Sequence, residues 1–304
     1  MANNLRKFTD YAAYSAATLV KPAVSLIADT NAVHFDQVEP PTPTINGDIS
    51  LTFNVSDASQ EVHLWYNDES ASEPSDFAPT QMWIDGVEET PVSSWRFDTT
   101  GDHIVEFAIA EVGGEKEIPD IAFKEIGNIT NVIIGSGITS IGGTDGEGAF
   151  AYCSGLTSVT IGDNVTFIGT STFYECTSLT SCTIGTGVTN IGDMVFYRCS
   201  GLTSIDIPNS VTSIGENTFM DCTSLTTLTI GSGITSIGYH AFQGHYNFTS
   251  ITIEATTPPT MDNEDGGVFD LRINCPIYVP AESVSAYQNS QYWSYWSSLI
   301  TAIQ

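Results

Sequence analysis

The chain has 304 residues and a formal net charge of −28, from 36 acidic and 8 basic residues, and 41% of its residues are hydrophobic. This content is enough for a sizeable core, and the length allows two domains or one elongated one. The negative charge disfavours contact with nucleic acid or an anionic membrane. No stretch approaches the roughly 18 consecutive apolar residues of a membrane-spanning helix, and we expect no secretory signal peptide at the N-terminus.

Residues 1–43 are predicted to form a docking segment followed by a proline-rich spacer. Helix formers in residues 8–20 stop at Lys21–Pro22, and residues 23–35 predict a hairpin. The segment is too short for a core of its own, so we expect it to dock on another protein. The candidate docking side chains are its apolar and aromatic ones: Phe8, Tyr11, Tyr14, Leu19, Val24, Leu26, Val33 and Phe35.

Residues 44–112 are predicted to form a small immunoglobulin-like β-sandwich. Candidate strands such as "ISLTFNV" and "HIVEFAI" alternate apolar and polar residues, and the length suits a small sandwich. Three tryptophans in this segment, Trp65, Trp83 and Trp95, are interpreted mostly as core, with a ligand platform as the alternative.

A phenylalanine recurs every 23 residues through the next segment, at Phe150, Phe173, Phe196, Phe219 and Phe242. Phe123 precedes this series and Phe269 follows it, each after a spacing of 27. A constant period of this length is typical of a solenoid. One coil cannot bury enough apolar surface to fold alone, whereas a stack of coils can.

Other columns repeat with the same period. The fourth position is cysteine in four coils, and the twelfth is isoleucine. Segments such as "LTSVTI" alternate isoleucine or valine with serine or threonine, which predicts a short strand with its hydroxyls facing outward. These outward positions form a candidate ligand-facing ladder of Ser158, Thr160, Ser181, Thr183, Ser204, Asp206, Thr227 and Thr229.

The nonapeptide "IGSGITSIG" occurs at residues 134–142 and again at residues 230–238. A glycine-rich loop of this kind could cradle a phosphate. However, the equivalent position of another coil holds Pro208, which has no N–H to donate, and the lysine of a phosphate-binding loop is missing. We therefore interpret the nonapeptide as a strand end, a turn and the next extended piece of a coil.

The repeat units, such as "FYECTSLTSCTIGTGVTNIG" and "FMDCTSLTTLTIGSGITSIG", resemble the BspA-like branch of the leucine-rich repeat family. The resemblance covers about residues 120–275, within a predicted repeat domain of residues 113–279. It implies a right-handed solenoid with parallel strands and a role in adhesion and binding rather than catalysis.

The chemistry-bearing residues predict no catalytic site, metal site or cofactor. The cysteine column forms a straight ladder, which cannot wrap a metal tetrahedrally, so we expect buried free thiols. His245 replaces cysteine in the last clear coil and is interpreted as a core or edge residue, with a metal pair with Cys222 as the alternative. Two acidic clusters are interpreted as solvated loops, with calcium binding as the alternative: Asp145 and Glu147, and Asp262, Glu264, Asp265 and Asp270.

Residues 280–304 are predicted to form a helical cap on the open end of the solenoid. Pro280 suits a first helical position, and Tyr292, Trp296, Leu299 and Ile303 fall near one helical face. Sugar stacking by Trp293 and Trp296 is the alternative interpretation. The "VPAESVSAY" stretch is similar to tails that follow the repeats in BspA-like proteins.

The fold class is thus mainly β, and the main functional hypothesis is a non-enzymatic phage virion appendage, either a head fibre or a tail-associated adhesin. The stretch "KFTDYAAYSAATLVKPAVSLIADTNAVHF" resembles the opening of structural proteins of tailed phages of gut bacteria. Residues 1–39 would bind capsid or tail proteins, and the repeats would bind a host-surface glycan or protein. We also expect a homo-oligomer. The alternative is a BspA-like adhesin on the bacterial cell surface.

Overall fold

The computed structural model describes residues 47–65, 77, 79–111, 114–144, 146–261, 267–270 and 273–304. The predicted docking segment, with its candidate side chains from Phe8 to Phe35, lies outside these residues and stays a prediction. Thr44–Gln304 form one compact unit. β-Strands dominate the described chain, in which no helix is long and apolar enough to cross a membrane.

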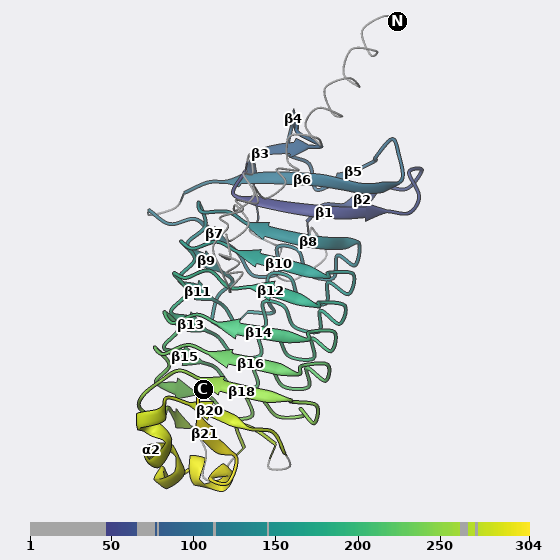
Figure 1. Cartoon of the computed structure of the whole chain (residues 1–304). Helices are drawn as coiled ribbons and strands as arrows, with labels where there is room; N and C mark the ends of the chain where they lie inside the picture. The colour runs from purple at the N-terminus through teal and green to yellow at the C-terminus, as the bar shows by residue number, and fades with distance from the viewer. Residues whose placement is uncertain are drawn as a thin grey trace, which may run out of the picture. The chain divides into compact units, whose positions relative to one another are not determined.

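Each coil of the solenoid contributes one longer strand to the same face of the stack (Figure 1). Burial alternates along these strands as predicted, since Ile205 and Ile207 are buried while Ser204 and Asp206 are exposed. Neighbouring strands run parallel, but the ladder divides between the third and the fourth. The strands are β8 (Ile129–Ile134), β10 (Ser158–Ile161), β12 (Ser181–Thr183), β14 (Ser204–Ile207), β16 (Thr227–Ile230), β18 (Ser250–Ile253) and β20 (Ile277–Val279).

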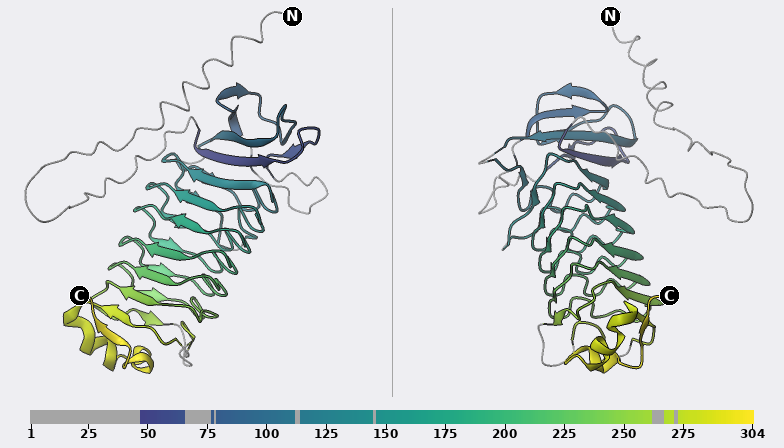
Figure 2. Two further views of the ribbon diagram at one scale, coloured as in Figure 1. Left: turned by 45° about the vertical axis from the view of Figure 1, so that its right-hand side comes forward. Right: turned by 60° about the vertical axis from the view of Figure 1, so that its left-hand side comes forward.

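A second parallel sheet of two-residue strands runs along another side of the coils, where Figure 1 labels β7 to β15 and Figure 2 shows the stacked coils from two further directions. Its members are β7 (Glu117–Ile118), β9 (Ser140–Ile141), β11 (Phe167–Ile168), β13 (Asn190–Ile191), β15 (Ser213–Ile214), β17 (Ser236–Ile237) and β19 (Thr260–Met261). A glycine follows most of these strands because the coils approach closely there. A Cβ on Gly238 would lie 2.6 Å from the carbonyl carbon of Gly215.

The repeated nonapeptide has the predicted structure. In its first copy β8 ends at Ile134, a turn closes with the Ile138 amide donating to the Gly135 carbonyl, and β9 follows. The glycines therefore serve the turn and the coil-to-coil approach.

The segment before the repeats forms β-structure, but an immunoglobulin-like sandwich is not confirmed. Its main sheet is antiparallel and consists of β1 (Ile49–Val55), β6 (Gly101–Ile109), β3 (Pro79–Ile84) and β4 (Val87–Glu89), while β2 (Val62–His63) pairs with β5 (Ser94–Trp95). β1 also pairs with β8, so this sheet continues into the solenoid. An exposed edge on β8 would leave backbone groups unpaired, and β1 satisfies them.

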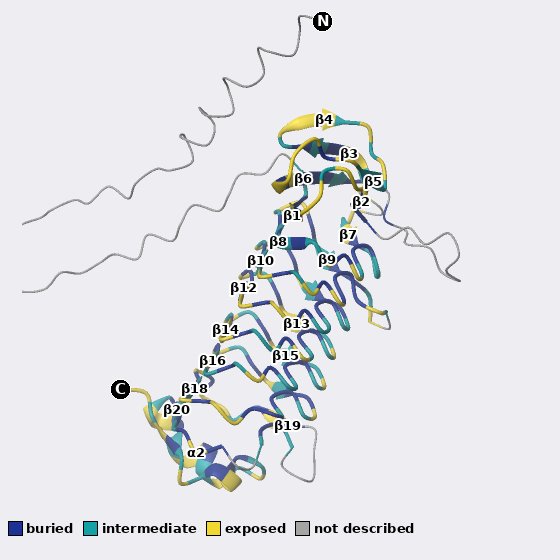
Figure 3. Ribbon diagram, turned by 90° about the vertical axis from the view of Figure 1, so that its right-hand side faces the viewer, coloured by how far each residue is buried: buried dark blue, intermediate teal, exposed yellow. Residues whose placement is uncertain are grey.

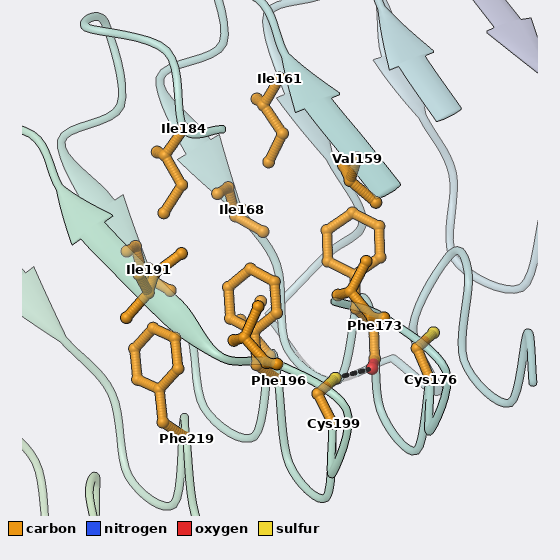
Figure 4. Close-up of a cluster of buried hydrophobic side chains, with 14 of the residues drawn as sticks. Val159, Ile161, Ile168, Phe173, Cys176, Ile184, Ile191, Phe196, Cys199 and Phe219 are labelled. Atoms are coloured by element: carbon orange, nitrogen blue, oxygen red, sulfur yellow. Dashed lines mark hydrogen bonds between the residues drawn. The ribbon is translucent and has the colours of Figure 1, made fainter. Parts of the chain in front are cut away.

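A column of phenylalanine rings runs through the solenoid interior (Figure 4). All seven rings are buried, with neighbouring centroids 4.9–5.5 Å apart and planes within 16° of parallel. This separation is close to the spacing of paired strands, about 4.8 Å, so the rings stack without disturbing the backbone ladders. The members are Phe123, Phe150, Phe173, Phe196, Phe219, Phe242 and Phe269.

Edge-on aromatic contacts end the column on both sides. Phe77 packs on Phe123 with centroids 4.8 Å apart and planes at 62°. At the other end Trp296 packs on Phe269 at 5.5 Å and 86°. At each end of the column, the last phenylalanine ring is therefore covered by an aromatic side chain that packs edge-on and not stacked.

The C-terminal segment caps the solenoid, but the predicted continuous helix is wrong. The segment forms a short 3₁₀ turn η1 (Ala281–Ser283), the helix α2 (Val284–Asn289), a second turn η2 (Trp293–Trp296) and the strand β21 (Ile300–Ala302). Ser290 has an extended backbone that ends α2. β21 pairs in parallel with β20, because pairing satisfies the last strand edge better than a longer helix would.

The aromatic cap residues are core, which excludes the sugar-stacking alternative for the two tryptophans. Trp293 and Trp296 are 0% and 2% exposed. The Trp293 indole donates to the Pro259 carbonyl at 3.0 Å, and the Tyr287 hydroxyl donates to the Ala255 carbonyl at 2.9 Å. Ile303, by contrast, is exposed and does not belong to the predicted buried face.

We predict that Phe196→Ala lowers the free energy of unfolding by about 3–5 kcal/mol, because it opens a cavity in the middle of the phenylalanine column. Tyr197→Ala is the matched control, since it removes the neighbouring ring, which is only half-buried. Chemical denaturation should show less than half the loss for the control. Equal losses in the two variants would contradict a dominant role of the column.

Candidate functional site

The strand face carries the predicted ladder in two straight rows. Pairing places Ser158 beside Ser181 and Thr160 beside Thr183, and, further along, Ser204 beside Thr227 and Asp206 beside Thr229. Five of the eight side chains are exposed and Ser158, Thr160 and Thr229 are half-exposed. The strand pairing therefore places all eight on one face of the stack, and Figure 3 colours the ribbon of these strands by burial.

The rows are held by hydrogen bonds between coils. A threonine that precedes the strand donates its hydroxyl to the equivalent threonine carbonyl one coil back, as from Thr180 to Thr157 at 3.0 Å. On the face itself, Ser158 Oγ donates to Asn131 Oδ1 at 2.7 Å. Asp206 is the single ionisable member of the rows, so the face is an array of mainly neutral donors and acceptors.

The rows have one interruption that the sequence analysis did not predict. β12 and β14 belong to different sheets, and the Thr203 amide reaches the Thr180 carbonyl at 3.4 Å. The division coincides with Cys182, which is half-buried where the other coils bury a valine, isoleucine or leucine. A small side chain at this position gives the strand less apolar contact with the core.

The cysteine column is structural. The cysteines are free, and each column thiol is buried and donates to a phenylalanine carbonyl of the preceding coil, as from Cys199 Sγ to the Phe173 oxygen at 3.1 Å (Figure 4). Burial raises the pKa of Cys153 to about 12 and raises those of Cys176, Cys199 and Cys222 as well. A thiol in this state is a poor nucleophile and a poor metal ligand near neutral pH.

His245 occupies the position that is cysteine in four other coils, and its imidazole ring makes a different hydrogen bond from the thiols. The side chain is 1% exposed, and its Nδ1 lies 2.8 Å from the Phe242 carbonyl, so Nδ1 carries the proton and donates. Its Nε2 is buried without a hydrogen-bond partner. Burial lowers the pKa of His245, which keeps the ring neutral. Among the described residues no group of three or more potential ligands gathers to hold a metal ion.

The acidic clusters lie partly outside the described residues. This applies to Asp145 and to the run of Asp262, Glu264 and Asp265. Glu147 is described, and its carboxylate forms a salt bridge with Lys124. Calcium binding by these loops therefore stays an alternative that the structure does not test.

A row of tyrosines on another side of the coils was not predicted. Tyr174 and Tyr197 stack with centroids 4.9 Å apart, and Tyr152 packs edge-on against Tyr174 at 5.3 Å. The Arg198 guanidinium lies 5.0 Å from the Tyr197 ring centroid and pairs with Glu175 at 3.1 Å. The tyrosines that follow phenylalanine in "FYEC" and "FYRC" were the signal in the sequence.

Residues 116–249 match the BspA type leucine rich repeat region, in six copies. The match lies within the predicted repeat domain of residues 113–279 and covers less than half of the chain. No curated protein matches the chain.

The solved structures that are similar to the chain include three leucine-rich repeat proteins. A leucine-rich repeat protein of Bacteroides ovatus has 23% identity over 65% of this chain and 48% of its own, with a TM-score of 0.42. A leucine-rich repeat protein of T. pallidum has 25% identity over 41% of this chain and 62% of its own, with a TM-score of 0.37. A leucine rich cell surface protein of Faecalibacterium prausnitzii has 25% identity over 57% of this chain and 49% of its own, with a TM-score of 0.31. The chain thus spans less than two thirds of each.

We predict that His245→Cys, which restores the column residue, makes stability less sensitive to acid. Because the pKa of His245 is lowered on folding, the unfolded chain binds the proton more readily. Stability from the neutral ring is complete above about pH 6.5 and is lost as the pH falls toward the lowered pKa. Thermal melts between pH 8 and pH 4.5 should show a smaller drop in melting temperature for the variant. Identical melting profiles would refute the assignment of this acid sensitivity to His245.

Proposed function

We propose that the chain is a non-enzymatic adhesion protein of a bacterial cell surface and that the strand face holds its partner. One observation carries the proposal. Eight polar side chains stand in two rows on an exposed face, while the phenylalanine and cysteine columns are buried. The BspA-type repeats support an adhesive or structural role rather than catalysis.

The chemistry of the face suits an extended, neutral or basic partner. Hydroxyl groups both donate and accept hydrogen bonds, and here they repeat at the strand spacing of about 4.8 Å. A glycan or polypeptide laid along the solenoid would contact several coils at once. The net charge of −28 repels acidic partners. A host-surface glycan or protein is therefore the proposed partner, and self-association into a homo-oligomer would multiply the contacts.

A phage virion appendage is the second candidate. It rests on the resemblance of residues 7–35 to structural proteins of tailed phages, in a part of the chain that the structure does not describe. Capsid or tail proteins would then be the partners of that segment. The same strand face would be the host-binding surface in either setting.

We predict that Thr183→Tyr and Thr229→Tyr each weaken adhesion at least tenfold, because a bulky ring rises from a flat hydroxyl row. Tyrosine is well tolerated in strands, so the fold should persist. The measurement is the binding of chain-coated microspheres to host cells.

Matched controls come from the same two coils. Thr177 and Thr223 are exposed outside the strands, and Thr177→Tyr and Thr223→Tyr should bind like the unmodified chain. Unchanged adhesion in the strand variants, or an equal loss in the controls, would refute a role for the strand face.

We predict that antibodies raised against residues 44–304 label the surface of intact bacterial cells that express the gene. Fractionation of the same culture separates the two candidates, because a virion protein would sediment with phage particles. If the antigen is found in particles and deletion of residues 1–39 removes it from them, the virion assignment replaces the cell-surface one.

A further inference from the structure

A cleft opens where the N-terminal sheet leaves the first coil of the solenoid. The pairing of β1 with β8 shifts register between Thr52 and Phe53, and the Asn54 amide still donates to the Asn128 carbonyl at 2.8 Å. Beyond this bond β1 continues past the start of β8 (Figure 1), while residues 124–128 turn into the coil. The two backbones diverge, and the space between them has a volume of about 570 Å³.

The inner wall of the cleft is apolar. Val55, Val62, Trp65 and Ile126 line it and are 3–9% exposed. Trp65 is anchored by edge-on contacts to Phe77 and Phe107, with centroids 5.7 and 5.6 Å away. Phe77 and Phe107 also pack on Phe123, the first ring of the phenylalanine column, so the wall belongs to the rigid core.

The rim of the cleft is polar. Two side-chain amides, Gln60 and Asn128, and the imidazole of His63 line it together with three carboxylates, Asp57, Glu61 and Glu125. Gln60 and His63 are exposed, and the Glu125 side chain is 61% exposed. These planar groups offer both donors and acceptors to a ligand.

We propose that this cleft is a binding site for a short neutral oligosaccharide. Its volume lies in the range of about 300–1,000 Å³ typical of small-ligand pockets, and it combines an apolar wall with a few polar groups. A pyranose ring presents an apolar C–H face to such a wall and hydroxyls to such a rim.

The charges of the cleft decide which oligosaccharides fit. Three lining carboxylates face one lining ammonium, that of Lys124, which lies 3.6 Å from Glu125 and also pairs with Glu147. Sialylated, sulfated or phosphorylated ligands would meet an excess of negative charge. Neutral sugars pay no such penalty, and the carboxylates accept hydrogen bonds from their hydroxyls.

The cleft shares no lining residue with the strand face, because its lining comes from the segments 54–65 and 124–128, whereas the rows begin at Ser158. The proposal therefore does not depend on adhesion through the rows. A chain with both sites would have a small, selective pocket at one end of an extended contact surface.

The test uses the whole chain on an array of neutral, amino, sialylated and sulfated oligosaccharides, followed by calorimetric titration of the best neutral trisaccharide. We expect neutral sugars to bind and acidic ones not to bind. Ser56→Trp, which fills the cleft from an exposed lining position, should abolish binding. Gln60→Ala should weaken it about fivefold, the effect of one hydrogen bond.

Two controls keep the outcome decisive. Thr183→Tyr blocks the strand face and should bind the trisaccharide like the unmodified chain, so failure of the cleft and failure of the strand face are distinguishable. Thermal melts verify that Ser56→Trp and Gln60→Ala remain folded. The proposal is overturned if no neutral sugar on the array binds, if acidic or amino sugars bind more tightly, or if both cleft variants bind normally.

Discussion

Stacking of one phenylalanine ring per coil is the interaction on which the rest of this structure depends. The rings from Phe123 to Phe269 lie 4.9–5.5 Å apart, nearly parallel and buried. Parallel strands about 4.8 Å apart and stacked rings demand almost the same translation between coils, so the two kinds of contact reinforce each other. Cysteine thiols bind the phenylalanine carbonyls of the preceding coil and hold the same translation at the backbone.

The side chains on the outer surface repeat with the same translation between coils as the rings in the core. Ser181 stands over Ser158 and Thr183 over Thr160 because their coils are related by the same step as the rings beneath. Regularity of the exposed hydroxyl rows is thus a consequence of core packing, whatever partner they bind. The phenylalanine column departs from stacked geometry at its two ends, where Phe77 packs edge-on against Phe123 and Trp296 packs edge-on against Phe269.

The periodic features were predictable from the sequence because each is repeated and local. The alternation in "LTSVTI" and the column of cysteines predicted the exposed and buried faces. Non-local pairings were not predictable in this way. β1 pairs with β8, although the contacting residues Thr52 and Thr130 lie 78 residues apart in the sequence. This pairing joins the N-terminal sheet to the solenoid and creates the cleft.

The C-terminal segment shows the same limit. Its apolar spacing fits a helical face, yet β20 needs an edge partner, and Ile300 is drawn into strand β21. The tyrosine row was visible in the sequence at Tyr174 and Tyr197, but its meaning required the stacking distances. Roles of the hydroxyl rows and of residues 1–43 stay predictions, because neither repetition nor packing identifies a partner.

The identical nonapeptides at Ile134 and Ile230 mark a molecule that can change length without redesign. Each of the four coils that begin at Phe150, Phe173, Phe196 and Phe219 offers a phenylalanine, a thiol and two strand edges to the coil on either side. An in-frame gain or loss of 23 codons would therefore leave both aromatic ends seated and move them by one strand spacing. Recombination within the gene could therefore lengthen or shorten the solenoid by whole coils, while the residues at each end stay the same.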